Sequence, residues 1–213
     1  MRIGVLGSGV VGMVLADGFL KKGHEVMRGS REPAKLQAWA AGAGATACAG
    51  TFVDAAGFGE IVVLAVKGTA AVEAAESCAG ALAGKTVIDT TNPIAEGPPV
   101  NGVIPFFTGP NDSLLERIQA KVPAARLVKA FSCVGNPLMV NPDLPGGPPT
   151  MFICGNDEGA KRQVAALLEQ LGWELADMGA AEAARAIEPL CMLWCIPGLR
   201  ENRWRHAFKL LRG

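Results

Sequence analysis

The feature that most constrains the fold of this sequence is a glycine loop that directly follows a short apolar segment at the N-terminus. Residues 2–6 predict a buried strand, and the next six residues are Gly7, Ser8, Gly9, Val10, Val11 and Gly12. A G-x-G-x-x-G pattern between a strand and a helix is typical of a dinucleotide-binding βαβ unit. There the first glycine permits a tight turn, the second lets a pyrophosphate approach the backbone, and the third lets helix and strand pack closely. The alternative is a glycine-rich turn that binds no ligand.

Short apolar runs recur along the chain and alternate with segments of helical spacing. The runs, which are too short for helices and too continuous for half-exposed strands, cover residues 2–6, 25–28, 61–66, 86–89, 127–130, 151–154 and 173–176, with a weaker candidate at 46–48. The helical segments are 10–22, 33–41, 69–81, 113–121 and 158–171. This alternation predicts an α/β fold of the Rossmann type, with a doubly wound, mainly parallel sheet covered by helices on both faces.

Two stretches interrupt this alternation, and the C-terminal segment departs from it. Residues 96–110 and 141–149 are rich in proline and glycine and predict loops. The first loop either covers a bound ligand or is a plain surface excursion. From Ala180 onward we expect helices at 182–188, 189–196 and 204–211. The sequence thus predicts a nucleotide-binding domain over residues 1–179 and a small helical lobe over residues 180–213.

The composition is that of a folded globular chain with no charge bias. Half of the 213 residues are apolar, and 20 Lys and Arg residues balance 20 Asp and Glu residues. A balanced chain lacks the basic field that binds phosphate backbones or anionic lipid. Every apolar run is also shorter than the ~18 residues that a membrane helix needs. We therefore expect neither nucleic acid nor a membrane as a partner.

The six cysteines indicate neither a disulfide framework nor a metal centre. None shows the C-x-x-C spacing of a structural zinc site, and six in 213 residues are too sparse for a disulfide scaffold. The first residues run straight into the strand and glycine loop, which leaves no room for a signal peptide. We expect reduced thiols, no bound metal and a cytoplasmic protein.

The end of the second predicted strand bears on which dinucleotide is bound. An NAD-binding chain normally places a carboxylate there to hold the ribose hydroxyls, whereas this chain has Arg28, Gly29, Ser30 and Arg31. A hydroxyl and a guanidinium, with Lys35 one turn further on, suit the 2′-phosphate of NADP. In the alternative interpretation Ser30 caps the helix that begins at Pro33 and the cations are solvated.

Few side chains could act as a general acid. The two histidines, His24 and His206, lie away from the predicted strand ends, and we expect both on the surface. A flavin-like hydride acceptor fits this absence, because the protein then needs only to align two rings and exclude water. Cys133 lies near the presumed chemistry, and Cys191 and Cys195 are four residues apart on a predicted helix. For all three thiols, core packing is the alternative to a chemical role.

Several motifs together resemble one family. They are the glycine loop, the Gly29-Ser30-Arg31 segment, Asp89-Thr90-Thr91-Asn92-Pro93, residues 129–135 (Lys-Ala-Phe-Ser-Cys-Val-Gly), and the short tail from Glu188-Pro189-Leu190 to residues 208–211. In these motifs the chain resembles, over essentially its whole length, the NADP oxidoreductases that depend on the deazaflavin coenzyme F420. The Rossmann motifs are shared with many dehydrogenases, whereas residues 129–131 and the short tail are more specific.

The resemblance implies a flavin-like ring stacked on the nicotinamide between a Rossmann domain and a helical lobe, often in a homodimer. It implies that Ser8, Ser30, Arg31 and Lys35 contact NADP, and that Lys67 borders the nicotinamide. The implied acceptor pocket consists of Asn92, Pro93, Ser132, Cys133 and Val134. All follow predicted strands, where open α/β sheets bind ligands, although each could be an ordinary loop residue. The family usually has Asn-Thr where this chain has Ser132 and Cys133.

The leading hypothesis is an NADP-dependent oxidoreductase that moves a hydride between NADPH and a deazaflavin, a flavin or another small acceptor. One alternative is an imine or carbonyl reductase of the 3-hydroxyacid dehydrogenase type. Those relatives usually carry about a hundred more residues of helical domain with a catalytic lysine, and the tail here is shorter. The other alternative is a catalytically silent module that senses NADP and signals through a partner.

Overall fold

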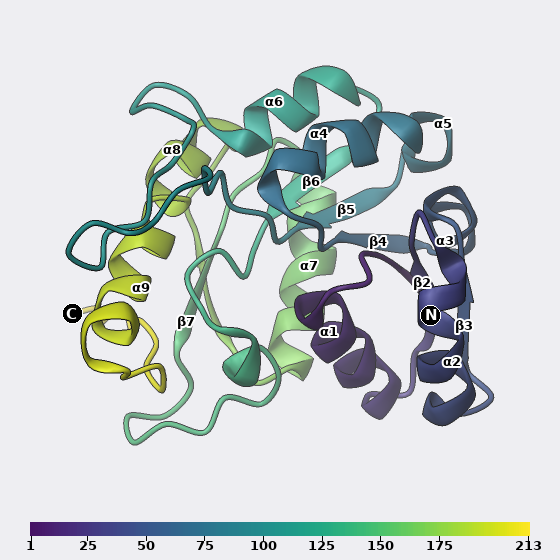
Figure 1. Ribbon diagram of the computed structural model, residues 1–213, viewed down its shortest axis with the longest axis horizontal. Helices are drawn as coiled ribbons and strands as arrows, with labels where there is room; N and C mark the ends of the chain where they lie inside the picture. Colours follow the sequence, from purple (N-terminus) through teal and green to yellow (C-terminus); the bar gives the residue numbers. More distant parts are fainter.

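The computed structural model describes residues 1–213 and contains a six-stranded, fully parallel sheet. The strand order is β3-β2-β1-β4-β5-β6, with β1 at Arg2–Leu6, β2 at Glu25–Gly29, β3 at Ala47–Gly50, β4 at Ile61–Leu64, β5 at Thr86–Asp89 and β6 at Arg126–Lys129 (Figure 1). The order reverses between β1 and β4, and such a switch point is where open α/β sheets bind ligands. The predicted doubly wound fold is confirmed.

Helices cover both faces of this sheet because consecutive strand residues point to opposite sides. One core contains Ile61 and Val63 of β4 with side chains from α1 (Val10–Lys21) and α7 (Glu158–Gln170). The other contains Val62 and Leu64 with side chains from α3 (Phe52–Phe58), α4 (Gly68–Ser77), α5 (Ala79–Leu82) and α6 (Leu114–Lys121). Two buried cores, one on each face, explain why the strands read as unbroken apolar runs.

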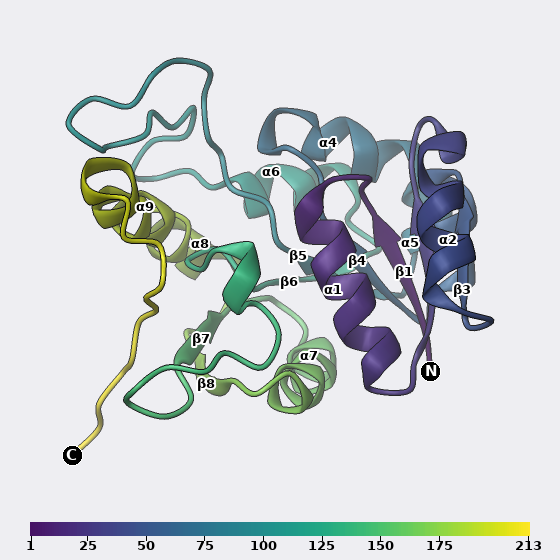
Figure 2. The same cartoon turned by 60° about the horizontal axis from the view of Figure 1, so that its bottom comes forward.

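The last two predicted strands do not join the large sheet. They are β7 at Thr150–Ile153 and β8 at Glu174–Asp177, which pair with each other in parallel on either side of α7. β6 meets this pair through one antiparallel bridge between Lys129 and Cys154. The chain therefore reverses direction after β6 and forms a two-stranded sheet (Figure 2), which the alternation of strands and helices could not predict.

The C-terminal region is partly helical. It contains a 3-10 turn η3 (Ala181–Ala183), α8 (Ala184–Ile187) and α9 (Leu190–Glu201). The predicted helix at 204–211 is wrong, because the chain leaves α9 through a left-handed Asn202 (φ 53°) and continues extended (Figure 2). Thr150 N donates to Phe208 O at 2.9 Å, so the tail lies along β7. Tertiary pairing thus overrides the helical pattern of this segment.

Smaller differences from the predicted elements concern the ends and breaks of helices. The predicted helix at 33–41 is a 3-10 turn η1 (Pro33–Leu36) followed by α2 (Gln37–Ala43). The predicted helix at 69–81 breaks at Cys78 between α4 and α5, and α3 and the 3-10 turn η2 (Asn136–Leu138) were not predicted. No helix is long and apolar enough to span a bilayer.

The proline-rich loop at 96–110 packs on the C-terminal region. An added Cβ at Gly102 would lie 2.7 Å from Cγ of Arg200, which places the tip of the loop against α9. The loop contributes no side chain to the cavity described below. The loop therefore does not cover this cavity.

Candidate functional site

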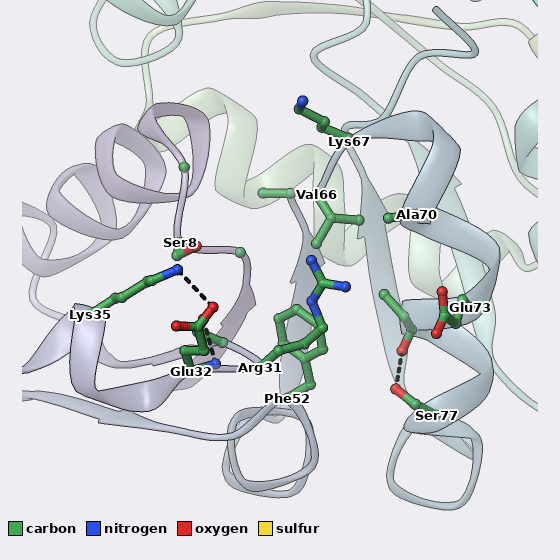
Figure 3. Close-up of a pocket in the computed structure, with 15 residues that line it drawn as sticks. Ser8, Arg31, Glu32, Lys35, Phe52, Val66, Lys67, Ala70, Glu73 and Ser77 are labelled. Atoms are coloured by element: carbon green, nitrogen blue, oxygen red, sulfur yellow. Dashed lines mark hydrogen bonds and ion pairs between the residues drawn. The ribbon is translucent and has the colours of Figure 1, made fainter. Parts of the chain in front are cut away.

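A cavity of about 420 Å³ opens where β1, β2 and β4 end (Figure 3). Its walls include seven of the ten residues predicted to bind the cofactor, namely Gly7, Ser8, Gly9, Ser30, Arg31, Lys35 and Lys67. Val10, Val11 and Gly12 begin α1 just beyond these walls. The predicted nucleotide residues are therefore brought together around one opening.

The glycine loop leaves room for a ligand at one position and none at the others. Gly7 has φ 150°, and an added Cβ there would lie 2.2 Å from Ala65 O. A Cβ at Gly12 would lie 2.8 Å from Gly7 O, whereas a Cβ at Gly9 would meet nothing within 4 Å. Gly9, the N-cap residue of α1, has no side chain to cap the helix, so the first N–H groups of α1 are available to an anion. This cradle fits a pyrophosphate.

Arg28 stabilises the glycine loop through hydrogen bonds, a role that the sequence did not lead us to predict. Its side chain is buried, and Nη2 donates to Gly7 O at 3.3 Å and to Gly9 O at 3.1 Å. The guanidinium lies 4.9 Å from the centre of the Trp39 ring, and Trp39 Nε1 donates to Asp17 Oδ1 at 2.7 Å. Burial lowers the Arg28 pKa and Asp17 opposes this. The sequence feature that could have predicted this role is an arginine within a predicted apolar strand.

The residues after β2 form the more exposed wall. Ser30 is buried and its Oγ accepts from Glu32 N at 3.1 Å, so it stabilises the local turn rather than capping η1 directly. Glu32 pairs with Lys35 at 2.7 Å, and the Lys35 ammonium holds the Glu32 pKa below its ordinary value. Arg31 is exposed and extends into the cavity (Figure 3). Two cations and one hydroxyl thus face a ligand at this end.

The predicted acceptor residues cluster with one another but do not line this cavity. Asn92 Nδ2 donates to Ser132 O at 3.0 Å and joins the loops after β5 and β6. Ser132, Cys133 and Val134 are buried, and an added Cβ at the neighbouring Gly135 would lie 2.5 Å from the Trp194 ring of α9. Burial raises the pKa of Cys133 to about 12, which keeps the thiol protonated at neutral pH.

Two buried polar atoms in this cluster have no protein partner. They are Asn92 Oδ1 and Ser132 Oγ. Phe131, which precedes Ser132, has a left-handed backbone (φ 60°), and its N–H contacts Met151 Sδ at 3.0 Å. Unpaired buried polar atoms and strained residues are concentrated at functional sites. The loop after β6 therefore differs from an ordinary surface turn.

A buried ion cluster lies directly behind these loops, and the sequence reasoning did not find it. Lys129 Nζ lies 2.6 Å from Asp89 Oδ2 and 2.7 Å from Glu188 Oε1, and it donates to Thr91 O at 2.9 Å. The Glu188 carboxylate also accepts from the N–H groups of Leu114 and Leu115 at the start of α6. The cluster ties the ends of β5 and β6 to the C-terminal region.

The histidines do not both lie on the surface as expected. His24 is 7% exposed, and its Nε2 lies 3.0 Å from Gln170 Oε1. The prediction is wrong for His24 because its ring packs edge-on against Phe19 in the core. His206 is half-buried and stacks on Trp194, with ring centroids 5.0 Å apart. Its Nε2 lies 2.9 Å from Trp194 O, so this ring serves to fix α9 to the tail.

The thiols of α9 interact with each other. Cys195 is half-buried and Cys191 is buried. The neighbouring Cys195 thiol raises the Cys191 pKa, and the Cys191 thiol lowers the Cys195 pKa. No group of three or more His, Cys, Asp or Glu side chains is arranged to hold a metal ion.

Comparisons with known proteins point to one class of enzyme. The family model described as NADP oxidoreductase, coenzyme F420-dependent, matches residues 2–93. A crystal structure from Arthrobacter sp. FB24, provisionally named an F420-dependent NADP reductase, superimposes with a TM-score of 0.90 at 33% identity and covers 100% of both chains.

Two further relatives have lower sequence identity to this chain. The F420-dependent NADP reductase of Methanocaldococcus jannaschii is 29% identical over 144 residues, which are 66% of this chain and 62% of that protein. The rat metalloreductase STEAP3 is 29% identical over 203 residues, which are 93% of this chain and 38% of that protein. The chain therefore spans less than two thirds of the length of each.

Proposed function

Because the chain belongs to the coenzyme F420-dependent NADP oxidoreductase family, we propose that it transfers a hydride between NADP(H) and the ring of a deazaflavin or flavin. Membership makes the chain an NADP-dependent oxidoreductase, and the acceptor is the proposed part. The observation that supports the NADP part of the proposal is the cavity, whose walls bring the glycine loop together with Ser30, Arg31 and Lys35.

The residues of the cavity fit the phosphates of NADP. The open space over Gly9 and the uncapped start of α1 suit a pyrophosphate, with Gly7, Ser8, Val10, Val11 and Gly12 forming the rest of the cradle. Ser30, Arg31 and Lys35 suit a 2′-phosphate. Glu32, the carboxylate nearest to them, is paired with Lys35. A 2′-phosphate can compete with Glu32 for this ammonium.

The loops after β4, β5 and β6 are proposed to hold the reacting rings. When bound, NADPH supplies a hydride from its nicotinamide ring. Lys67 marks the end of the cavity nearest these loops, and the proposed walls are Asn92, Pro93, Ser132, Cys133 and Val134. The unpaired Asn92 Oδ1 and Ser132 Oγ offer hydrogen bonds to a polar ring substituent. Residues 180–213, through Trp194, are proposed to complete this site and exclude water.

One observation supports a second candidate function. Ser132, Cys133 and Val134 are covered by the protein itself, and Trp194 lies against Gly135. A chain that keeps this arrangement after binding NADP would bind the dinucleotide without reaching an acceptor. It would then act as an NADP-sensing module.

Steady-state oxidation of NADPH tests both candidates. The purified protein would be assayed with oxidised deazaflavin, FMN, FAD and a panel of imines and carbonyl compounds. We expect turnover with the deazaflavin or a flavin, and consumption of one NADPH per acceptor reduced. Tight NADPH binding with no turnover on any acceptor would favour the sensing module, and turnover confined to imines or carbonyls would reject the ring acceptor.

A further inference from the structure

We propose that Glu73 of α4 recognises the amino edge of the adenine ring and selects an adenine nucleotide over its deaminated counterpart. This inference rests on the proposed function, since it requires NADP(H) to occupy the cavity. It concerns a residue that neither the glycine motif nor the end of β2 includes.

The cavity continues along α4 beyond the parts assigned to phosphates. Ala70, Glu73, Ala74 and Ser77 line it from this helix, and their spacing of three and four residues places them on one side of α4. From Ala70 to Ser77 the helix rises roughly 10 Å. Arg31 and Phe52 lie on the opposite side of the opening (Figure 3). The result is a slot between α4 and the residues that follow β2 and β3.

The geometry of the nucleotide places its base in this slot. The adenosine ribose carries both the 2′-phosphate, assigned to Ser30, Arg31 and Lys35, and the pyrophosphate, assigned to the glycine loop. The base on that ribose must therefore enter the remaining space beside α4. Val66, Ala70 and Ala74 provide an apolar wall there, and the Phe52 ring lies on the opposite side of the opening.

Glu73 is the carboxylate of the cavity that lacks a partner. Glu32 is paired with Lys35, whereas Glu73 is exposed and makes neither an ion pair nor a hydrogen bond through its side chain. A carboxylate in a cavity that binds phosphates repels the ligand unless it contacts a donor. It accepts hydrogen bonds and donates none, and the exocyclic amine of adenine is a donor.

The neighbouring groups do not take over this role. Ser77 Oγ already donates to Ala74 O at 2.8 Å, and the other charged side chains of the cavity are cations or the paired Glu32. In Figure 3 the Glu73 carboxylate lies beside the slot on the same helix as Ser77. Glu73 is therefore the group placed to read an amino substituent on the base.

The test compares NADPH with its deaminated analogue, reduced nicotinamide hypoxanthine dinucleotide phosphate, in which a carbonyl replaces the amine. Kd values would be measured by fluorescence titration for the native protein, Glu73→Gln and Glu76→Gln. Glu76 is the matched control, because it lies on α4 outside the cavity and pairs with Lys121 at 3.7 Å. We expect the native protein and Glu76→Gln to bind NADPH about tenfold more tightly than the analogue.

Glu73→Gln should reduce that ratio to within about threefold, because a glutamine amide can donate to the carbonyl as well as accept from the amine. Its preference for NADPH over NADH should stay unchanged, which separates base recognition from a general charge effect. Equal binding of both nucleotides by the native protein, or an unchanged ratio in Glu73→Gln, would overturn the role of Glu73 while leaving the proposed function intact. Failure of the native protein to bind NADPH would overturn both.

Discussion

Two groups of charged residues flank the ends of the parallel strands, and they differ in almost every physical respect. Lys35 and Glu32, beside the cavity, keep 61% and 66% of their side-chain surface exposed. Lys129, Asp89 and Glu188, behind the loops after β5 and β6, are 0%, 0% and 1% exposed. An exposed pair is screened by salt and rearranges at little cost. Loss of Lys129 from the buried cluster leaves Asp89 and Glu188 in the core without a cation.

The exposed Lys35–Glu32 pair is therefore suited to bind a ligand, whereas the buried cluster is suited to stabilise the fold. The exposed Lys35 can exchange its contact with Glu32 for a contact with a phosphate. The buried Lys129 is held by two carboxylates and by Thr91 O. Burial alone lowers the Lys129 pKa, but Asp89 and Glu188 together outweigh burial and the net shift is upward. Charged residues near a ligand site therefore need not all serve the ligand.

The largest expected effect is on stability when the buried cluster is broken. Lys129→Met leaves Asp89 and Glu188 facing each other in the core, and we expect a loss of about 3 to 5 kcal/mol in the free energy of unfolding. Lys35→Met, the matched change in the exposed pair, should leave the unfolding midpoint nearly unchanged. Urea denaturation of both variants measures the contrast. Equal effects of the two substitutions would remove the distinction between the groups.

The next effect is on binding when the exposed group is altered. Arg31→Ala should weaken NADPH binding about ten- to a hundredfold and leave NADH binding nearly unchanged, because the lost contact is to the 2′-phosphate. Isothermal titration of both nucleotides measures it. A parallel loss for NADH would show that Arg31 acts on the shared part of the dinucleotide, including its base.

A third prediction concerns the loop after β6, which follows the buried cluster in the chain. Cys133→Ala should keep most of the turnover, because the protonated, buried thiol packs against its neighbours. Cys133→Trp should block the acceptor while sparing NADPH affinity. Kinetics with each acceptor, alongside NADPH titration, separate these outcomes. An inactive alanine variant would give the thiol a chemical role, and full turnover by the tryptophan variant would place the acceptor elsewhere.

The smallest effect is a pH dependence that belongs to Lys129. Its folded pKa lies above the ordinary value of 10.5, so its contribution to stability is complete below that value and is lost as the pH rises through the folded pKa. The native protein should therefore lose stability in alkali more steeply than Lys129→Met. Denaturation midpoints between about pH 9.5 and about pH 12 compare the two. Parallel curves would contradict the assigned direction.

The sequence predicted the sheet well, and it predicted that the glycine loop and the residues after β2 lie together, because both depend on local patterns. Val62 to Leu64 form an apolar run that predicts a buried strand. Gly7, Gly9 and Gly12 have the spacing of a dinucleotide-binding loop within six consecutive residues. Lys129 and Glu188 could not be paired by such reasoning, because they are 59 residues apart, although Lys129 was visible as a charge in a predicted buried strand. Arg28 was visible as a charge in an apolar strand, but its partner carbonyls at Gly7 and Gly9 depend on the register of β1 with β2.

The C-terminal residues also show that a local sequence pattern does not predict tertiary contacts. Residues 204–211 have a helical pattern, yet Thr150 of β7 binds them in an extended form. The predicted division at Ala180 also separates Glu188 from Lys129, although the two are bonded in the core. Removal of residues 180–213 is therefore expected to expose the cluster and to unfold the chain, rather than to leave an intact nucleotide-binding domain.

The proposed function requires the exposed residues beside the cavity to contact the 2′-phosphate of NADP. The most direct test is the ratio of the Kd values of the native protein for NADH and NADPH, measured at a single low ionic strength. NADPH should bind at least about tenfold more tightly, because charge-assisted contacts to the phosphate are available only to that nucleotide. Equal affinity for the two nucleotides would contradict it.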